Sequence, residues 1–205
     1  GVLFIDEAPE CSSGVLDSLR QPLESGSITI ARATGNLTFP AEFILVIAAN
    51  PCPCGKFVGK GRNCTCSPLQ VRRYLAKLSG PLLDRIDLRV KVESVNRIEL
   101  AQGGESSAAI RERVIAAREA AAIRFKNETW KINSQIPARA LTKQYQATKA
   151  AMAFLHDELD RERITARGLH KILRTSWTLA DLANRNQPDL AEVKSAYQLR
   201  EGNDY

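Results

Sequence analysis

Short runs of consecutive apolar residues mark two strands in the first half of the chain. Residues 2–6 and 43–49 each form such a run, the pattern of a strand buried on both faces. Between them, residues 27–39 alternate apolar and polar positions in two arms, which predicts a hairpin with Gly35 and Asn36 in its turn. The pattern therefore indicates a core that contains a sheet.

Helical spacing occurs on either side of the hairpin. Residues 12–25 place leucines on one side of a helix, and Pro22 is expected to kink or break its last part. Residues 68–78 predict a basic helix after a loop rich in Pro, Gly and Cys. A last short strand is predicted from three alternating apolar residues, Leu88, Val90 and Val92.

The pattern becomes all-helical after a Gly-Gly-Glu-Ser-Ser linker at residues 103–107. Apolar residues recur at helix spacing over residues 110–125, which predicts a first helix. Further helices are predicted after caps at Thr142 and Thr165, and over residues 189–200.

Two domains are therefore expected, an α/β domain over residues 1–95 and an all-α domain over residues 96–205. No apolar run reaches the roughly 18 residues that a membrane helix needs, so no membrane contact is expected. The cysteines are odd in number and no signal-peptide pattern precedes them, which favours a reducing, cytoplasmic location. Because Gly1 leads straight into a strand pattern, we expect the chain to be a fragment of a longer protein.

The net charge of +6 is concentrated in one segment. Residues 56–91 contain nine Lys and Arg against two Asp, so the rest of the chain is close to neutral. Such a cluster suits a polyanion, either a nucleic acid or the phosphates of a nucleotide. An ordinary solvated surface has the same composition.

Polar side chains end both apolar strands. Asp6 and Glu7 follow the first strand, and Asn50 follows the second. Open α/β sheets bind ligands at the carboxyl ends of their strands, where Asp can hold the Mg²⁺ shell and Glu can polarise an attacking water that Asn positions. Each feature taken alone is also explained by an ordinary strand end or turn.

Two arginine patterns point to phosphate chemistry. Arg85 lies between two Asp residues after a Gly-Pro break, a position that suits either a structural ion pair or an arginine finger donated to a neighbouring subunit's nucleotide. Arg167, Lys171 and Arg174 recur at helix spacing as one basic stripe. Because a cation in the first turn opposes the helix dipole, Arg167 indicates an anionic partner unless the stripe is simply solvated.

Four of the five cysteines lie in one loop: Cys52, Cys54, Cys64 and Cys66. Four thiolates can close a tetrahedral structural zinc site, although C-x-C pairs are less diagnostic than C-x-x-C pairs. Reduced thiols, and disulfides formed after purification, are the alternatives. Cys11 is expected to be a small core residue.

Several strings of the sequence together resemble one family. The strings are Gly-Val-Leu-Phe-Ile-Asp-Glu-Ala-Pro-Glu, Leu-Arg-Gln-Pro-Leu-Glu-Ser-Gly, Ala-Ala-Asn-Pro-Cys-Pro-Cys-Gly, Leu-Ser-Gly-Pro-Leu-Leu-Asp-Arg-Ile-Asp and Ala-Arg-Gly-Leu-His-Lys-Ile-Leu-Arg. They resemble the magnesium-chelatase-related AAA+ ATPases and, within them, the bacterial ComM-like or YifB-like group. The resemblance covers nearly the whole chain. It implies the second half of an AAA+ P-loop NTPase core, starting at the Walker B strand, followed by a C-terminal helical lid.

The resemblance also implies roles for single residues. Asp6 and Glu7 are similar to a Walker B pair, and Asn50 is similar to sensor 1. Arg85 is similar to the arginine finger, and Arg167 is similar to the sensor 2 arginine of the lid. ATP and Mg²⁺ are the implied cofactors, with Asp6 at the Mg²⁺ ion, and the implied assembly is a hexameric ring.

For the ComM-like group, the resemblance implies DNA helicase or branch-migration activity in natural transformation. The hairpin is similar to the pre-sensor-1 hairpin of MCM-type helicases, in which a basic tip residue touches DNA in the central pore, and Arg32 falls at that position. The basic loop adds three candidate DNA contacts on account of their charge, Lys56, Lys60 and Arg62.

One family element is missing from these 205 residues. They contain no G-x-x-x-x-G-K-[ST] string, whose backbone amides and lysine hold the phosphates, so the chain alone is expected not to hydrolyse ATP. Two other interpretations stay open. One is a magnesium-chelatase-type motor subunit that remodels a partner protein, although the cysteine loop favours the ComM-like group. The other is a non-catalytic, zinc-stabilised nucleic-acid-binding module.

Overall fold

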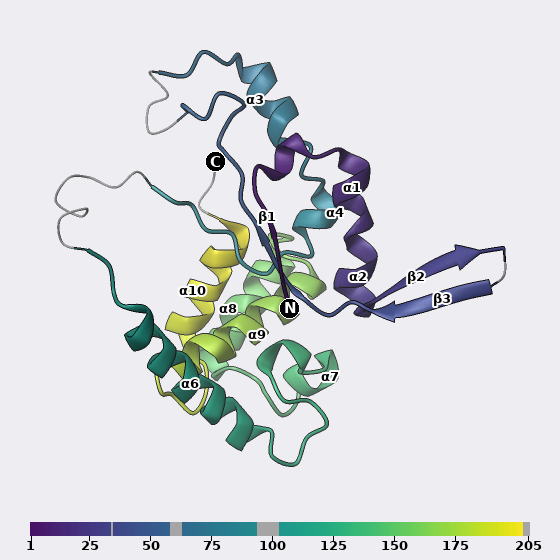
Figure 1. Cartoon of the computed structure of the whole chain (residues 1–205). Helices are drawn as coiled ribbons and strands as arrows, with labels where there is room; N and C mark the ends of the chain where they lie inside the picture. Colours follow the sequence, from purple (N-terminus) through teal and green to yellow (C-terminus); the bar gives the residue numbers. More distant parts are fainter. Residues whose placement is uncertain (34, 58–62, 94–102, 203–205) are drawn as a thin grey trace. The chain divides into compact units, whose positions relative to one another are not determined.

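The computed structural model describes residues 1–33, 35–57, 63–93 and 103–202. They form two compact units, Gly1–Ile86 and Asp87–Tyr205 (Figure 1). The strands of the described residues all lie in the first unit, and the second unit is helical. The predicted class, α/β followed by all-α, is confirmed. The domain boundary expected after residue 95 falls outside the described residues.

Two parallel strands form the sheet of the first unit. β1 (Val2–Ile5) pairs with β4 (Ile44–Ile47) residue by residue. Backbone hydrogen bonds extend this pairing beyond both strands, because Ala48 N donates to Ile5 O at 2.9 Å and Ala8 N donates to Ala48 O at 3.0 Å. The carboxyl ends of the two strands therefore meet at one edge of the sheet.

Neither strand is buried on both faces, so this part of the sequence prediction is wrong. Four side chains on one face are 42–69% exposed: Val2, Phe4, Ile44 and Val46. On the other face, Ile5 and Ile47 pack against a small core of Ala8, Leu16 and Leu82. The described residues thus cover one face of the sheet and leave the other face exposed.

The helix predicted after β1 is divided into two at Leu19. α1 (Ser13–Ser18) ends there and α2 (Arg20–Ser25) begins directly afterwards. Pro22 has no N–H to donate to the carbonyl four residues earlier, so the first helix cannot continue through it. The expected break is confirmed.

Three short helical elements complete the first unit. The 3-10 helix η1 (Ala8–Glu10) follows β1. α3 (Pro68–Leu75) confirms the predicted basic helix and starts with a capping box, in which Ser67 and Gln70 satisfy each other's backbone N–H groups. α4 (Gly80–Leu83) follows it.

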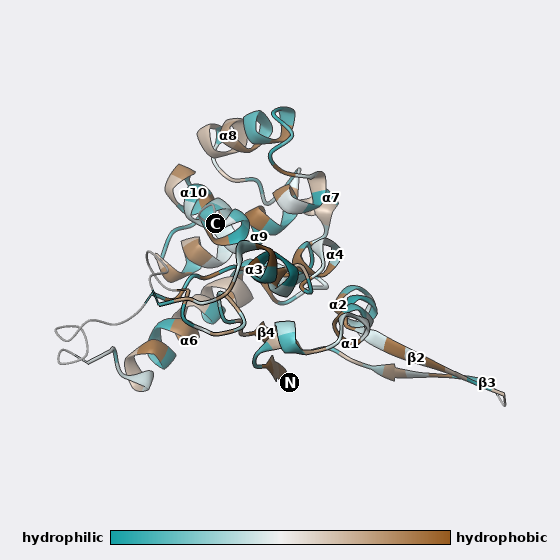
Figure 2. Ribbon diagram, turned by 90° about the horizontal axis from the view of Figure 1, so that it is seen from above, coloured by the Kyte–Doolittle hydropathy of each residue, from teal (hydrophilic) through white to brown (hydrophobic). Residues whose placement is uncertain are grey.

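The hairpin is confirmed, but its turn lies earlier than predicted. β2 (Ser27–Arg32) pairs antiparallel with β3 (Gly35–Pro40), and Gly35 already opposes the last residue of β2. Gly35 and Asn36 therefore belong to the strand, and Ala33 is the described part of the turn. Gly35 has a φ of 133°, which favours glycine and lets the chain leave the turn there. Figure 2 shows apolar stretches along β2.

The second unit is built from four long and two short helices among its described residues: α6 (Ser107–Arg124), η2 (Asn133–Gln135), α7 (Ala138–Leu141), α8 (Lys149–Asp160), α9 (Ala166–Leu182) and α10 (Leu190–Glu201). Thr165 caps α9 as predicted, since its hydroxyl accepts the Gly168 N–H at 3.0 Å. Thr142 instead ends α7 in a helical backbone conformation, and Thr148 precedes α8. No helix in the described ranges is long and apolar enough to cross a bilayer.

The strand predicted from Leu88, Val90 and Val92 does not form. These side chains are 47–89% exposed, and the described residues 87–93 have no partner strand. Arg89 N instead donates to Leu199 O of α10 at 2.5 Å. Alternating apolar residues alone do not form a strand where no neighbouring strand provides backbone hydrogen bonds.

Aromatic rings form the centre of the second unit. Four of them pack edge to face: Phe125, Trp130, Tyr145 and Trp177. The Arg124 guanidinium lies 4.1 Å from the Trp177 ring centroid and forms an ion pair with the buried Asp181. This ion pair joins α6 to α9 inside the unit.

Candidate functional site

The candidate site lies where β1 and β4 end. Asp6 and Glu7 follow β1 directly, and Asn50 comes two residues after Ala48, which closes the ladder between the strands. All three polar side chains are exposed. The structure therefore brings the three residues to the same edge of the sheet, the position in which open α/β sheets bind ligands.

Glu7 has an unusual backbone conformation. Its φ of 49° and ψ of 40° lie in the left-handed region, which costs a non-glycine residue about 1–2 kcal/mol. Its N–H donates to Asp6 Oδ1 at 2.9 Å, and η1 begins at the next residue. Such strain persists only where the surroundings fix the residue, and it concentrates at functional sites.

Tyr74 connects α3 to this edge. Its side chain is 5% exposed. Burial, followed by the charges of Glu10 and Glu7, raises the pKa of Tyr74, while a backbone hydrogen bond with Asn50 lowers it. The phenol therefore lies beside the ends of both strands. The sequence analysis did not single out Tyr74, since one tyrosine in a basic helix carries no pattern.

Arg85 lies just after α4 and has partners inside the first unit. Its guanidinium donates to Glu24 Oε1 and to Pro81 O, both at 2.5 Å, and its side chain is 12% exposed. The structure thus shows the ion pair that the sequence offered as one alternative. A role as arginine finger requires the guanidinium to leave Glu24 for the phosphate of another subunit.

The basic stripe on α9 is not a row of solvated cations. Arg167 is exposed in the first turn. Lys171 Nζ lies 3.0 Å from Asp87 Oδ1, and Arg174 donates twice to Ile136 O, at 3.0 and 2.7 Å. Burial lowers the pKa of Arg174. Lys171 and Arg174 therefore have partners within the second unit.

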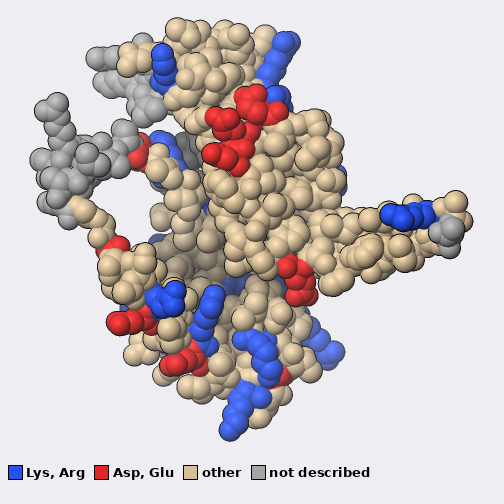
Figure 3. Space-filling view, viewed as in Figure 1, with Lys and Arg blue, Asp and Glu red and all other residues tan. Residues whose placement is uncertain are grey.

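The candidate DNA contacts lie on the hairpin and the cysteine loop. Arg32 ends β2, is exposed and is the only charged residue of the hairpin over residues 27–40. Figure 3 shows this single blue patch near the hairpin's end. Lys56 is exposed. Lys60 and Arg62 lie outside the described residues.

The four loop cysteines converge on one point. The Cys52 Sγ lies 3.4 Å from Cys54 Sγ and 3.6 Å from Cys64 Sγ, and the latter two are also 3.6 Å apart. With Cys66, all four sulfurs lie within 4.8 Å of one another. These separations exceed the roughly 2.05 Å of a disulfide, and all five cysteines of the chain are free thiols.

Backbone N–H groups point at these sulfurs. Hydrogen bonds from the backbone of Lys56 and then Thr65 lower the pKa of the Cys54 thiol from 9.0 to about 6. For Cys64, a backbone hydrogen bond with Cys66 acts in the same direction, but desolvation and the neighbouring thiols raise its pKa to about 12. The backbone hydrogen bonds therefore favour the thiolate of Cys54, whereas desolvation and the neighbouring thiols disfavour that of Cys64.

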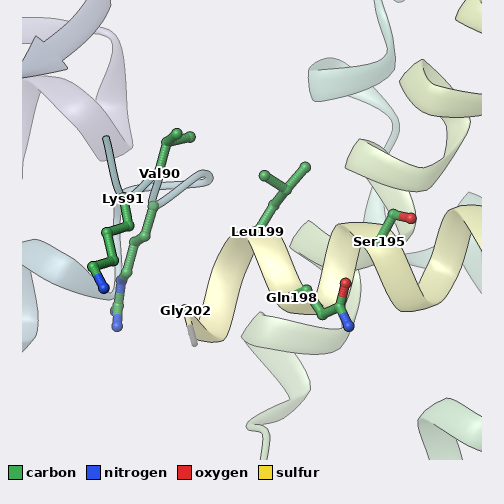
Figure 4. Close-up of a pocket in the computed structure, with 7 residues that line it drawn as sticks. Val90, Lys91, Ser195, Gln198, Leu199 and Gly202 are labelled. Carbon is green, nitrogen blue, oxygen red and sulfur yellow. The ribbon is translucent and has the colours of Figure 1, made fainter. Parts of the chain in front are cut away.

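A separate cavity of about 410 Å³ occurs in the second unit (Figure 4). It is lined by seven residues: Arg89, Val90, Lys91, Ser195, Gln198, Leu199 and Gly202. Arg89 and Lys91 belong to the basic segment 56–91, but none of the residues predicted individually for nucleotide, metal or DNA binding lines this cavity.

Two family models match the chain and cover most of it. One is described as magnesium chelatase, subunit ChlI, and matches residues 1–100; the other, its C-terminal part, matches residues 104–200. The chain belongs to the magnesium-chelatase-related AAA+ family. Members of this family are related to AAA+ ATPases, and the α/β unit followed by a helical unit agrees with their fold.

Curated relatives share this sequence over nearly its whole length. An uncharacterized protein of Mycobacterium tuberculosis is 44% identical over 98% of this chain and 40% of its own length. The competence protein ComM of Haemophilus influenzae is 42% identical over 94% of this chain and 38% of its own. An uncharacterized YifB protein of Escherichia coli is 35% identical over 100% of this chain and 39% of its own. The chain thus spans about two-fifths of these relatives.

Proposed function

We propose that this chain carries the hydrolysis and sensing residues of an AAA+ ATPase that couples ATP hydrolysis to movement on DNA. The observation that carries the proposal is the single sheet edge at which Asp6, Glu7 and Asn50 meet. Membership of the magnesium-chelatase-related AAA+ family supports ATP as the nucleotide.

The three residues suit distinct steps of phosphoryl transfer. The Asp6 carboxylate is the oxygen donor that Mg²⁺ prefers, so the residues present fit this metal. Bound Mg²⁺ neutralises charge that develops on the phosphate oxygens. The exposed Glu7 carboxylate orients the attacking water and accepts its proton, and the Asn50 amide holds that water by hydrogen bonding.

The phosphate-binding half of the site is not part of these 205 residues, since they contain no G-x-x-x-x-G-K-[ST] string. The chain spans about 40% of the length of its relatives. We place the phosphate-binding loop in the remaining part of the longer protein. We therefore expect the chain by itself to show no ATP turnover.

Two arginines complete the site in a ring. Arg85 leaves its ion pair with Glu24 and reaches the γ-phosphate bound by the neighbouring subunit. Arg167, exposed in the first turn of α9, contacts nucleotide phosphate from the lid. Ring formation, with a hexamer as the expected size, is part of the proposal because a finger acts on a neighbour.

DNA is the proposed substrate along which the motor moves. The reason is that the hairpin carries one cation, Arg32, at the end of β2 and is otherwise uncharged. A relative that shares 42% identity is a competence protein, which supports a role in DNA handling during natural transformation. The family models are named for magnesium chelatase, which supports a second candidate, a motor that remodels a partner protein.

The test is ATP turnover by the purified full-length protein with and without single-stranded and branched DNA. We expect DNA to stimulate turnover, and we expect Arg32→Glu to remove that stimulation. Turnover that is indifferent to every DNA substrate would favour the protein-remodelling motor. No turnover at all, with nucleotide and Mg²⁺ in excess, would favour the non-catalytic binding module.

A further inference from the structure

The cysteine loop is held by few apolar contacts. Of residues 51–57 and 63–67, which the structure describes, only Cys52 is fully buried. A loop of this length loses roughly 1–2 kcal/mol of backbone entropy for each residue that is ordered. A tight turn, in which Gly55 N donates to Cys52 O at 3.0 Å, begins the loop but does not join its two arms.

The four sulfurs have the spacing of a tetrahedral metal centre. Zinc–thiolate bonds of about 2.3 Å place the sulfurs of a regular tetrahedron about 3.8 Å apart. The sulfurs of Cys52, Cys54 and Cys64 are 3.4, 3.6 and 3.6 Å apart, and all four sulfurs lie within 4.8 Å of one another. Four cysteine sulfurs without a carboxylate or imidazole are the donor set of a closed structural zinc site.

The cluster is continuous with the candidate hydrolysis edge. Cys52 comes two residues after Asn50, and Cys66 comes two residues before the first residue of α3. α3 carries Tyr74, which is buried beside Asn50, Cys52 and Glu7. Joining the two arms of the loop therefore fixes both the segment that carries Asn50 and the helix that carries Tyr74.

We propose that Cys52, Cys54, Cys64 and Cys66 bind one zinc ion, and that this centre holds Asn50 and Tyr74 in place beside Glu7. The zinc centre stands apart from the proposed ATPase function, because its test needs neither nucleotide nor DNA. It makes the geometry of the sheet edge dependent on a metal that takes no part in the chemistry there.

The first test is metal content of the chain purified without chelator. Elemental analysis is expected to give about one zinc per chain for the wild type. The matched variants are Cys64→Ser, which removes one ligand, and Cys11→Ser, which removes the cysteine outside the cluster. We expect Cys64→Ser to lose the zinc and Cys11→Ser to retain it.

A second measurement covers the case in which Cys64→Ser does not fold. The wild-type chain is stripped with a chelator and given Co²⁺, which in a tetrahedral thiolate site produces strong visible bands and thiolate-to-cobalt charge transfer. A chain free of metal with four readily alkylated thiols, and without these bands, overturns the zinc centre. Iron together with acid-labile sulfide overturns the assignment to zinc.

The link to the sheet edge is tested by hydrogen exchange on the zinc-loaded and the stripped chain. We expect faster exchange of the amides at residues 48–56 and 67–75 after stripping, because the loop loses its closure. Fluorescence of Trp130 and Trp177, which both lie in the second unit, is expected to stay unchanged and controls for global unfolding. Zinc loss that leaves exchange at both segments unchanged overturns this link.

Discussion

Glu7 couples an exposed carboxylate to a backbone conformation that its neighbours enforce. The left-handed φ of 49° turns the chain between β1 and η1, and the bond from its N–H to Asp6 Oδ1 fixes the preceding carboxylate. The backbone between Asp6 and Glu7 positions both carboxylates. A substitution at Glu7 that keeps the side-chain shape and removes its charge therefore tests its chemical role without changing this geometry.

Glu7→Gln makes that separation in the full-length protein. We expect ATP binding to persist and turnover to fall at least about 10²-fold, as for the loss of a positioned base. Glu10→Gln, an exposed glutamate three residues away, is the matched control and retains turnover. The measurements are steady-state ATP hydrolysis and nucleotide affinity for the wild type and both variants. Turnover at the wild-type rate in Glu7→Gln would show that Glu7 is not the catalytic base.

Strand-end residues could be predicted from the sequence, whereas long-range partners could not. Asp6 and Asn50 follow apolar runs, and parallel strands bring such ends together. The partner of Arg85 is Glu24, 61 positions away, and no local pattern pairs them. The neighbours of Tyr74 likewise come from two other segments of the chain, one with Glu7 and Glu10 and one with Asn50 and Cys52, so no local pattern points to it.

At the scale of elements, α10 illustrates how a cap makes a helix sensitive to pH. Asp189 Oδ1 accepts the Leu190 N–H and the Thr148 hydroxyl, each at 2.8 Å, and Glu192 completes the capping box. The bond from Leu190, then that from Thr148, lowers the pKa of Asp189. Its stabilising effect is therefore complete above the unfolded pKa of about 4 and is lost as pH falls through the lower folded value.

Asp189→Asn keeps a capping oxygen and removes the charge. We expect the variant to unfold at a lower temperature than the wild type near neutral pH. The difference between the two unfolding temperatures is expected to narrow as pH falls below about 4. Tryptophan fluorescence measures this, because both tryptophans lie in the second unit. A difference in unfolding temperature that is the same at every pH would show that the Asp189 charge does not contribute to stability.

Caps and turns also show where sequence signals are ambiguous. Thr165 caps α9 as the sequence predicts, whereas Thr142 directly follows the last residue of α7 and starts no helix. The two threonines differ in backbone conformation, which their local sequence does not reveal. Likewise, Gly35 and Asn36 are typical turn residues, yet the pairing of the flanking strands sets the turn earlier.

The hairpin supplies the prediction on DNA affinity. In the full-length protein, Arg32→Ala is expected to weaken DNA binding and to reduce the slope of log affinity against log salt by about one for each phosphate that Arg32 neutralises. Lys143→Ala removes the same charge from an exposed site in the second unit and leaves both quantities unchanged. Equal slopes for Arg32→Ala and wild type would exclude the hairpin as a phosphate-binding element.

At the scale of the whole molecule, the sheet leaves an apolar face uncovered by the described residues. Val2, Phe4, Ile44 and Val46 are 42–69% exposed on that face. The sequence pattern predicted burial on both faces, and it is the pattern of strands inside a larger sheet. Since the relatives are longer than this chain, we expect the remaining part of the full-length protein to cover this face.

The most direct test of the account is movement of DNA by the full-length protein. A synthetic three-strand junction with a labelled displaced strand is incubated with protein, ATP and Mg²⁺, and the released strand is measured over time. We expect release that requires hydrolysable ATP and is abolished by Glu7→Gln. A protein that hydrolyses ATP through Glu7 and binds the junction, yet releases no strand, would contradict the account.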